Sequence, residues 1–274
     1  LSENSDDFRK TVNSLFRDEL SFPEWCYVIE RKGEIIGRVG FWAPHSNDKK
    51  TIRIFGLELP WEESDLLSLG KTLLNKSIHD MKKQGARSLG CQIHSDEQSF
   101  NLCQELYELI GMKISQTKKR YFINNNLFKN KNDNRLRYKS LEETGKKLFI
   151  KILRKVTEGT LDREYKLDIA QQGAEKAAYN HLKSYKSIDN ALNNMFLAYK
   201  NDEIIGLIIP QLLKDDLGAI NYIGVIPAER GKGYVIDLLD KGIRNLLKRN
   251  VNKILADIDV LNFPMENALK KVGF

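Results

Sequence analysis

The chain has 274 residues, of which 41% are hydrophobic and 30% charged, so it is long enough for one large or two ordinary domains. Its apolar stretches are too short to cross a bilayer, no secretory signal is visible, and its three scattered cysteines are too few for a disulfide framework. The net charge of +7 favours encounters with anions, but no zinc-finger, basic-zipper or aromatic RNA-binding signature accompanies it.

From this composition we expect a cytoplasmic protein with reduced thiols, no membrane partner and no specific nucleic-acid partner. The histidines are far apart in the sequence, and no pair has the close Cys/His spacing that is typical of a zinc site. We therefore expect no bound metal. The histidines are His45, His79, His94 and His181.

The first half of the chain predicts a β-hairpin, a strand, a helix, a second strand and a shorter helix. The hairpin covers residues 27–42 and contains the tetrapeptide Glu-Ile-Ile-Gly at 34–37. An apolar strand ends at Pro60, and a helical stripe follows it. The next strand covers 88–94, and the shorter helix ends at 111–112. The stripe consists of Leu66, Leu69, Leu73 and Ile78.

The second half repeats this order of elements. The same tetrapeptide returns at 203–206 within a second hairpin, and the next apolar strand ends at Pro227. A helical stripe, a strand at 253–259 and a helix that ends at 273–274 complete the copy. Small changes in spacing between the copies are what loop-length changes produce, so we infer a tandem duplication. The second stripe consists of Val235, Leu239, Ile243 and Leu246.

The boundary between the copies is expected in the Asn- and Lys-rich stretch 124–134, which has turn-forming composition and few apolar residues. This gives domains at residues 1–128 and 129–274. Residues 136–139 are expected to begin the first strand of the second domain, and 145–185 have apolar residues at helical spacing.

A basic glycine turn joins a strand to a helix at residues 222–234. The first amides of a helix have no partner within it and lie at the positive end of its dipole, so such a turn favours a phosphate. Gly231 and Gly233 allow a ligand to approach the backbone, while Arg230 and Lys232 add positive charge.

The order of strand, Val-x-Pro-x-x-Arg-Gly-x-Gly turn, helix, acidic strand end and Gly-Phe helix end resembles the GNAT superfamily of acyl-CoA-dependent N-acetyltransferases. The ending Asn-x-Pro-Met at 262–265 with Gly-Phe at 273–274 is similar to that of some bacterial tandem GNAT proteins. The motifs cover residues 196–274, and over the first half the resemblance is architectural. It implies an α/β fold of two tandem GNAT-like domains, each a mixed, mostly antiparallel twisted sheet flanked by helices. The matching residues are Val225, Pro227, Arg230, Gly231, Gly233, Asp259, Gly273 and Phe274.

The resemblance implies that acetyl-CoA binds in the second domain. Its pyrophosphate would be held by the turn and the first helical amides, and its thioester arm would lie along the end of the preceding strand. Asn262 would either order the turn before the last helix or contact the coenzyme. The last position of the turn motif is Val235 rather than Gly or Ala, and this larger side chain narrows the approach of the pyrophosphate to the backbone. The expected coenzyme residues are Ile223, Gly224, Val225, Arg230, Gly231, Lys232, Gly233, Tyr234, Val235 and Asn262.

The first domain has the opposite charges at the corresponding turn. Aligning the two prolines puts Glu63 at the position of Arg230 and Asp65 at that of Lys232. Carboxylates at a helix N-terminus repel a pyrophosphate, although they also suit ordinary helix stability. We interpret this domain as a degenerate copy that does not bind the coenzyme.

The resemblance implies direct attack of an acceptor amine on the thioester, with the amide of Val225 contacting the carbonyl oxygen. Relatives have a tyrosine acid at the position of Leu269, which cannot donate a proton. Tyr222 is the nearest titratable side chain to the expected thioester, and Asp259 ends the next strand together with Asp257. Tyr222 and Asp259 are thus the candidate catalytic residues. The alternatives are packing for the tyrosine, turn capping for the acids, and a water relay for the proton.

We therefore expect an N-acetyltransferase that transfers acetyl from acetyl-CoA to a primary amine on a small molecule or peptide. The alternative is a catalytically silent acyl-CoA-binding or regulatory protein, and a homodimer is left open. Relatives also continue past Gly-Phe into at least one more strand, so the sheet edge is expected to need a cover. A trimmed stretch, the first domain or a partner chain could supply it.

Overall fold

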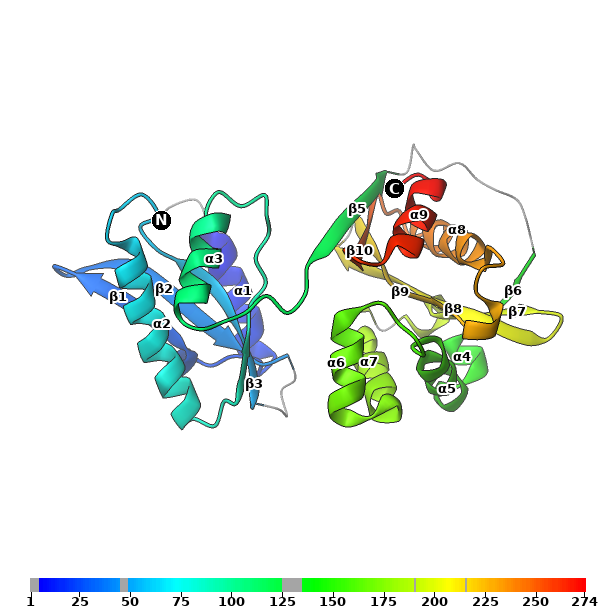
Figure 1. Cartoon of the computed structure of the whole chain (residues 1–274), viewed down its shortest axis with the longest axis horizontal. Coiled ribbons are helices and arrows are strands. Elements are labelled where there is room, and N and C mark those ends of the chain that lie inside the picture. Colours follow the sequence, from blue (N-terminus) through cyan, green and yellow to red (C-terminus); the bar gives the residue numbers. More distant parts are fainter. Residues whose placement is uncertain (1–4, 45–48, 125–134, 190, 215) are drawn as a thin grey trace. The chain divides into compact units, whose positions relative to one another are not determined.

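The computed structural model describes residues 5–44, 49–124, 135–189, 191–214 and 216–274. The chain forms two compact units, residues 1–113 and 114–274, each with its own sheet and hydrophobic core (Figure 1). No helix among the described residues is long and apolar enough to cross a membrane.

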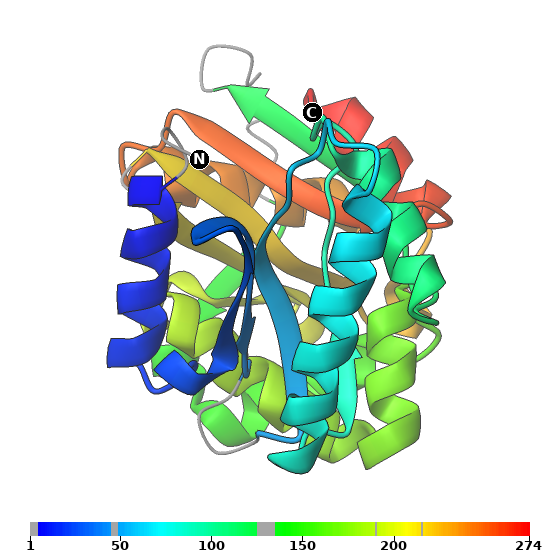
Figure 2. The same ribbon diagram turned by 90° about the vertical axis from the view of Figure 1, so that its left-hand side faces the viewer.

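The first unit is a four-stranded sheet in the order β1-β2-β3-β4, antiparallel except for the parallel pair β3 and β4. Along β3, Ile52 and Ile54 are buried in the core with α2 and α3, whereas Phe55 stacks on Phe8 of α1. Because side chains alternate along a strand, α1 covers one face and α2 and α3 the other. Figure 2 shows α1 and α2 on opposite sides of the strands. The elements are α1 Ser5–Arg17, η1 Pro23–Trp25, β1 Cys26–Arg31, β2 Glu34–Trp42, β3 Thr51–Glu58, α2 Leu66–Lys83, β4 Ser88–Gly90 and α3 Phe100–Leu109.

The second unit is a six-stranded sheet in the order β5-β10-β9-β8-β7-β6, in which only β10 and β9 pair in parallel. Along β8, Ile208 contributes to the core under α8 and α9, while Leu207 and Ile209 contribute to the core under α5 and α7. Helices therefore cover both faces of this sheet (Figure 1). The elements are β5 Lys118–Asn124, β6 Arg137–Ser140, α4 Leu141–Thr144, α5 Lys146–Val156, α6 Arg163–Gln172, α7 Ala174–Ile188, η3 Leu192–Asn194, β7 Phe196–Lys200, β8 Glu203–Lys214, β9 Leu217–Val225, η4 Pro227–Glu229, α8 Tyr234–Leu247, β10 Lys253–Asp259 and α9 Phe263–Val272.

The units part between Lys113 and Ile114, whereas the boundary expected at residues 128 and 129 lies outside the described residues. The reason is β5, which pairs antiparallel with β10 from Lys118 opposite Asp259 to Asn124 opposite Lys253. Residues that the sequence analysis placed in the first domain thus cover the edge of the second sheet.

Polar contacts between β5 and the elements after it hold this added strand. Lys119 and Tyr121 of β5 donate hydrogen bonds to the Glu266 carboxylate of α9 at 3.1 and 2.6 Å, and Lys270 donates another at 2.8 Å. These three donors, with Lys270 first, lower the pKa of Glu266 from 4.5 to about 2. The carboxylate therefore stays ionised in the folded protein through most of the acidic range.

Replacing Glu266 with Gln should remove a pH-dependent part of the stability. Because the folded-state pKa is lowered, the contribution of Glu266 is complete above pH 4.5 and is lost as the pH falls toward about 2. In urea unfolding, the stability difference between the original protein and Glu266→Gln should be largest above pH 4.5 and shrink toward pH 2. Glu175→Gln, at an exposed glutamate of α7, is the control. A pH-independent difference would contradict the assignment.

Candidate active site

Strands β9 and β10 diverge within the second sheet. They pair in parallel only where residues Leu217, Gly218 and Ala219 face Lys253, Ile254 and Leu255. Beyond these pairs β9 continues along β8 to Val225, and β10 continues along β5 to Asp259. Among the described residues, the second half of β9 therefore pairs with β8 on one edge and with no strand on the other, as expected for a strand that receives an extended ligand.

The backbone groups of β9 at this opening can be assigned from the ladder with β8. The amide of Ile226 donates to the carbonyl of Ile205 at 2.8 Å. Because an antiparallel ladder alternates, the N–H and C=O groups of Val225 and Ile223 face the opposite edge, where β10 has diverged. Gly224 has another role, since a Cβ there would lie 2.7 Å from Cβ of Val156 at the end of α5.

The glycine turn has the backbone shape that its sequence predicts. Gly231 and Gly233 have φ of +79° and +81°, a region that residues with a Cβ rarely adopt. A Cβ on Gly231 would meet no atom within 4 Å, so the backbone there is open to a ligand. Helix α8 begins directly afterwards at Tyr234, and the side chain of Val235 packs against the core, which leaves its amide at the helix end.

The two cations of the turn are engaged with other protein groups. Arg230 donates from Nε to the carbonyl of Val225 at 3.1 Å, and from Nη2 to the carbonyls of Val156 and Glu158 at 3.0 and 2.7 Å. Lys232 lies 3.0 Å from both carboxylate oxygens of Glu229, and this hydrogen bond is the main cause of its raised pKa.

These contacts change the roles expected for the turn side chains. The guanidinium of Arg230 connects the end of β9 to the loop 157–162 that follows α5. Tyr234 is only 5% exposed, and its hydroxyl accepts a hydrogen bond from Lys200 at 2.8 Å. A ligand at the turn would therefore meet the backbone amide of Tyr234 rather than its ring. The anion-binding capacity of the turn thus resides mainly in its backbone.

Tyr222 lies in an aromatic cluster on the face of the sheet that α6 and α7 cover. Its ring centroid is 5.0 Å from that of Tyr165 and 6.0 Å from that of Tyr185, and His181 stacks on Tyr165 at 4.1 Å. Burial raises the pKa of Tyr222, and the nearby charge of Asp162 raises it further. The phenol therefore stays protonated at neutral pH and can donate a hydrogen bond.

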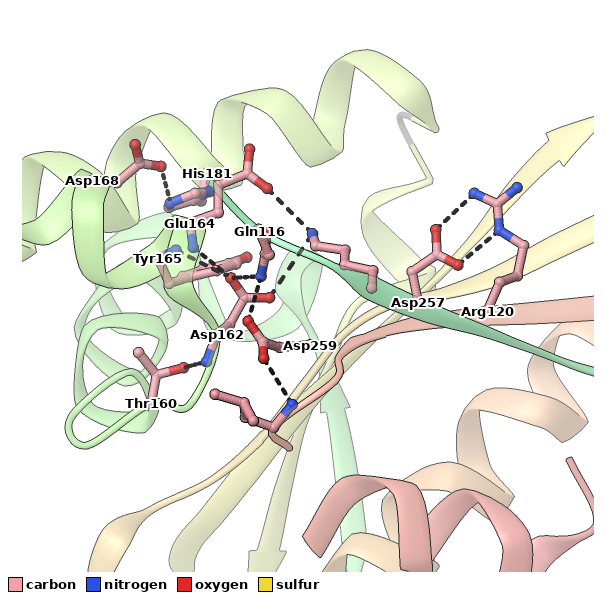
Figure 3. A network of polar contacts seen from close by, with 12 residues as sticks. Gln116, Arg120, Thr160, Asp162, Glu164, Tyr165, Asp168, His181, Asp257 and Asp259 are labelled. Carbon is pink, nitrogen blue, oxygen red and sulfur yellow. Dashed lines mark hydrogen bonds and ion pairs between the residues drawn. The ribbon is translucent and has the colours of Figure 1, made fainter. Parts of the chain in front are cut away.

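Asp259 is 1% exposed and its two carboxylate oxygens accept hydrogen bonds at the end of β10. The amide of Leu261 donates to Oδ1 at 2.9 Å, and Nε2 of Gln116 donates to Oδ2 at 3.0 Å (Figure 3). Burial alone would raise the pKa of Asp259, but these hydrogen bonds outweigh burial and the pKa is lowered. Asp257 instead forms a bidentate pair with Arg120, both distances being 2.8 Å.

Asp259 and Asn262 thus have the turn contacts that the sequence left as an alternative, whereas the pairing of Asp257 with Arg120 was not among its alternatives. Oδ1 of Asn262 accepts a hydrogen bond from the amide of Met265 at 3.3 Å and so caps α9. A carboxylate whose pKa is lowered is a weaker proton acceptor, which argues against Asp259 as a base.

Several polar residues at the opening were not singled out from the sequence. Asp162 caps α6, because Oδ1 accepts from the amides of Glu164 and Tyr165 at 2.9 and 3.2 Å. Gln116, just before β5, donates to this oxygen at 3.2 Å as well as to Asp259. The sequence signal for Asp162 is that of an ordinary helix start, and Gln116 carries none.

His181 is a further residue of this region. Its Nε2 lies 3.0 Å from Oδ2 of Asp168, but the two atoms are not aligned for a hydrogen bond. Among the described residues, no group of three or more His, Cys, Asp or Glu side chains could hold a metal ion.

The corresponding turn of the first unit has different chemistry. Glu63 and Asp65 both pair with Arg31, at 2.6 and 2.8 Å. Leu66, which aligns with Gly233, begins α2 and is 7% exposed. Carboxylates therefore occupy the positions of Arg230 and Lys232, and an apolar side chain occupies the position of Gly233.

Comparisons with known proteins agree with this geometry. Residues 161–274 match the model of the acetyltransferase (GNAT) family. A GCN5-related N-acetyltransferase from Sphaerobacter thermophilus has a similar fold, with a TM-score of 0.64 and 13% identity over 92% of this chain and 76% of that one. A GNAT-family acetyltransferase from Colwellia psychrerythraea gives a TM-score of 0.54 and 9% identity over 100% and 93%.

A tandem GNAT protein from the clavulanic acid biosynthesis pathway gives a TM-score of 0.52 and 11% identity over 91% of this chain and 81% of that one. No curated protein matches the chain. The fold is therefore that of two tandem GNAT-like domains, each a mixed, mostly antiparallel sheet flanked by helices. The GNAT resemblance is thereby confirmed, with the family match at residues 161–274.

Proposed function

We propose that the second unit binds acetyl-CoA and transfers its acetyl group to a primary amine of a small molecule or peptide. One observation carries this proposal: a turn of two left-handed glycines at the start of α8 lies next in the chain to the end of β9, where the strand has no neighbour on one edge. The first feature suits a pyrophosphate, and the second suits an extended pantetheine arm.

The residues of the chain divide the binding work as follows. The backbone amides of the turn and of Tyr234 and Val235 would donate hydrogen bonds to the pyrophosphate oxygens. The outward backbone groups of Ile223 and Val225 would pair with the amides of the pantetheine arm, as a further strand would. The amide of Val225 is then placed to contact the thioester carbonyl oxygen as negative charge develops there.

The chemistry would be direct transfer. The acceptor nitrogen attacks the acetyl carbon, the carbon–sulfur bond breaks, and the thiolate of coenzyme A takes up a proton. Because the phenol of Tyr222 is protonated at neutral pH, it can supply a hydrogen bond or a proton to the sulfur. Asp259 and Asn262 would act by ordering the turn between β10 and α9.

A catalytically silent acyl-CoA-binding or regulatory protein is the second candidate. One observation favours it: Leu269, where relatives have a tyrosine acid, has 0% exposure and lies in the apolar core under α9. The side chain of Leu269 has no proton to donate. In an active enzyme another residue would therefore have to protonate the leaving thiolate. Thiol release across a panel of amines separates the two candidates.

Gly233→Glu should abolish binding of acetyl-CoA. A side chain at φ +81° strains the backbone, and its carboxylate repels the pyrophosphate, so the Kd should rise by at least about 100-fold. Gly111→Glu is a matched control, because Gly111 has φ +84° and no atom within 4 Å of a Cβ, in the other unit.

Isothermal titration calorimetry should detect one equivalent of acetyl-CoA per chain for the original protein and for Gly111→Glu. Absence of heat with the original protein would refute the proposal. A second bound equivalent would refute the interpretation of the first unit as a degenerate copy.

Arg230 should act through its hydrogen bonds rather than through its charge. Both Arg230→Lys and Arg230→Gln lose the planar donors that reach the carbonyls of Val156, Glu158 and Val225. We expect both variants to speed amide hydrogen exchange in residues 157–162 by about 10-fold or more, with the Kd for acetyl-CoA changing less than about threefold. Normal behaviour of Arg230→Lys together with weak coenzyme binding by Arg230→Gln would instead indicate a charge role.

A further inference from the structure

The buried carboxylate of Asp259 and the half-buried carboxylate of Asp162 meet through one amide group. Nε2 of Gln116 donates to Oδ1 of Asp162 at 3.2 Å and to Oδ2 of Asp259 at 3.0 Å, so it lies between them (Figure 3). Asp162 comes from the start of α6 and Asp259 from the end of β10, so these acids are far apart in sequence. Two carboxylates at one site can have different protonation roles when their surroundings differ.

The hydrogen bonds of the two acids are unequally distributed. In Asp259 both oxygens accept hydrogen bonds, Oδ1 from Leu261 and Oδ2 from Gln116, and the backbone of Arg163 donates another to this carboxylate. In Asp162 the three hydrogen bonds from Glu164, Tyr165 and Gln116 all reach Oδ1. The nearest cation to Oδ2 of Asp162 is the Lys118 ammonium, at 3.9 Å. Oδ2 is thus the carboxylate oxygen with capacity for a further proton or hydrogen bond.

The surroundings shift the pKa values of the two carboxylates in opposite directions. Burial raises the pKa of Asp162, and the attraction of Lys118 and the hydrogen bonds do not cancel the effect. The pKa of Asp259 is lowered because its hydrogen bonds outweigh burial. Asp162 is accordingly the better proton acceptor of the pair, and Asp259 the permanently charged member.

Asp162 also lies beside the residues expected at the thioester. The backbone amide of Tyr165 donates a hydrogen bond to the Asp162 carboxylate, and the ring centroid of Tyr165 lies 5.0 Å from that of Tyr222. The loop 157–162 that ends at Asp162 is held to the end of β9 by Arg230, which bonds the carbonyls of Glu158 and Val225. The carboxylate therefore belongs to the same rigid arrangement as the outward edge of β9.

We propose that Asp162, through Oδ2, is the catalytic base that takes the proton from the acceptor amine, an assignment that rests on the proposed acetyl transfer. The neutral amine nitrogen forms the new bond to the acetyl carbon while the carbon–sulfur bond breaks and its electron pair goes to sulfur. One proton leaves nitrogen for Asp162, which then releases it to solvent, and one proton reaches sulfur from Tyr222, whose phenol regains one from solvent. Atoms and charges balance to an N-acetyl amide and free coenzyme A thiol.

Other charged or titratable groups face Asp162 from each neighbouring element, and their charges affect the pH at which Asp162 titrates. Glu164 lies on its own helix, and Tyr222 on β9 faces the same cluster. The remaining groups are Lys118 of β5, Arg163 of α6, Asp259 of β10 and Tyr185 of α7.

Asp162→Asn tests the proposal because it removes the basic oxygen and keeps the helix cap. Asn and Asp are equally good N-cap residues, and Oδ1 of Asn can accept the same hydrogen bonds. The matched control is Glu164→Gln, two residues along the same helix, which also removes one carboxylate near Lys118. Turnover is measured by thiol release with acetyl-CoA and saturating amine from a panel of primary amines, between pH 5 and 9. Calorimetry gives the Kd for acetyl-CoA.

We expect Asp162→Asn to lower kcat by about 100-fold and to lose the decline of kcat at acidic pH, with the Kd for acetyl-CoA changed less than about threefold. Glu164→Gln should keep kcat and the decline of kcat at acidic pH, with that decline moved to lower pH because the charge of Glu164 no longer raises the pKa of Asp162. An Asp162→Asn protein with the original kcat and pH profile would overturn the assignment while leaving acetyl transfer intact. Acetyl-CoA binding without turnover on any amine would also overturn it, in favour of the silent protein. Absence of binding to the original protein would instead overturn the proposed function itself.

Discussion

The end of parallel pairing at Ala219 and Leu255 is the constraint on which the second unit depends. Backbone N–H and C=O groups need partners, and a strand that loses a neighbour inside a sheet must be held by its other edge. Strand β9 is held by β8, and β10 is held by β5, so both strands keep a partner where they no longer pair with each other. The glycine turn and the loop after α5 both reach the end of β9, where Arg230 bonds carbonyls of each side.

Features that depend on neighbouring residues in the sequence were predictable, and those that depend on distant segments were not. The hairpins, the helical stripes and the backbone shape of Gly231 and Gly233 follow from local patterns, and the structure confirms them. The pairing partner of β5 does not follow from local patterns, because the alternating sequence of β5 suits the edge of either sheet. What selects β10 is a set of contacts across the chain, such as Tyr121 with Glu266 and Arg120 with Asp257. The boundary expected at residues 128 and 129 lies outside the described residues and stays a prediction.

The same distinction applies to the side chains at the opening. Sequence spacing placed Arg230 and Lys232 at an anion-binding turn, but it could not show that carbonyls and Glu229 already engage them. For Asp259 and Asn262 the sequence offered capping as one of two readings, and the hydrogen bonds of the folded chain correspond to that reading. Asp162 was missed because an Asp before a helix is the commonest kind of cap, and only the tertiary fold brings Gln116 and β10 to it.

The first unit shows that two strands can diverge without a glycine turn after them. Its parallel pair β3 and β4 also stops early, at Arg53 opposite Gly90, while β3 continues along β2 to Glu58. The fold therefore provides the same kind of strand end in both units. What differs is the turn that follows, where Glu63 and Asp65 are bound to Arg31 in one unit and bare glycine backbone precedes α8 in the other. Packing depends on the apolar stripes, whereas the proposed anion binding depends on a few residues of one turn, so the two can change independently.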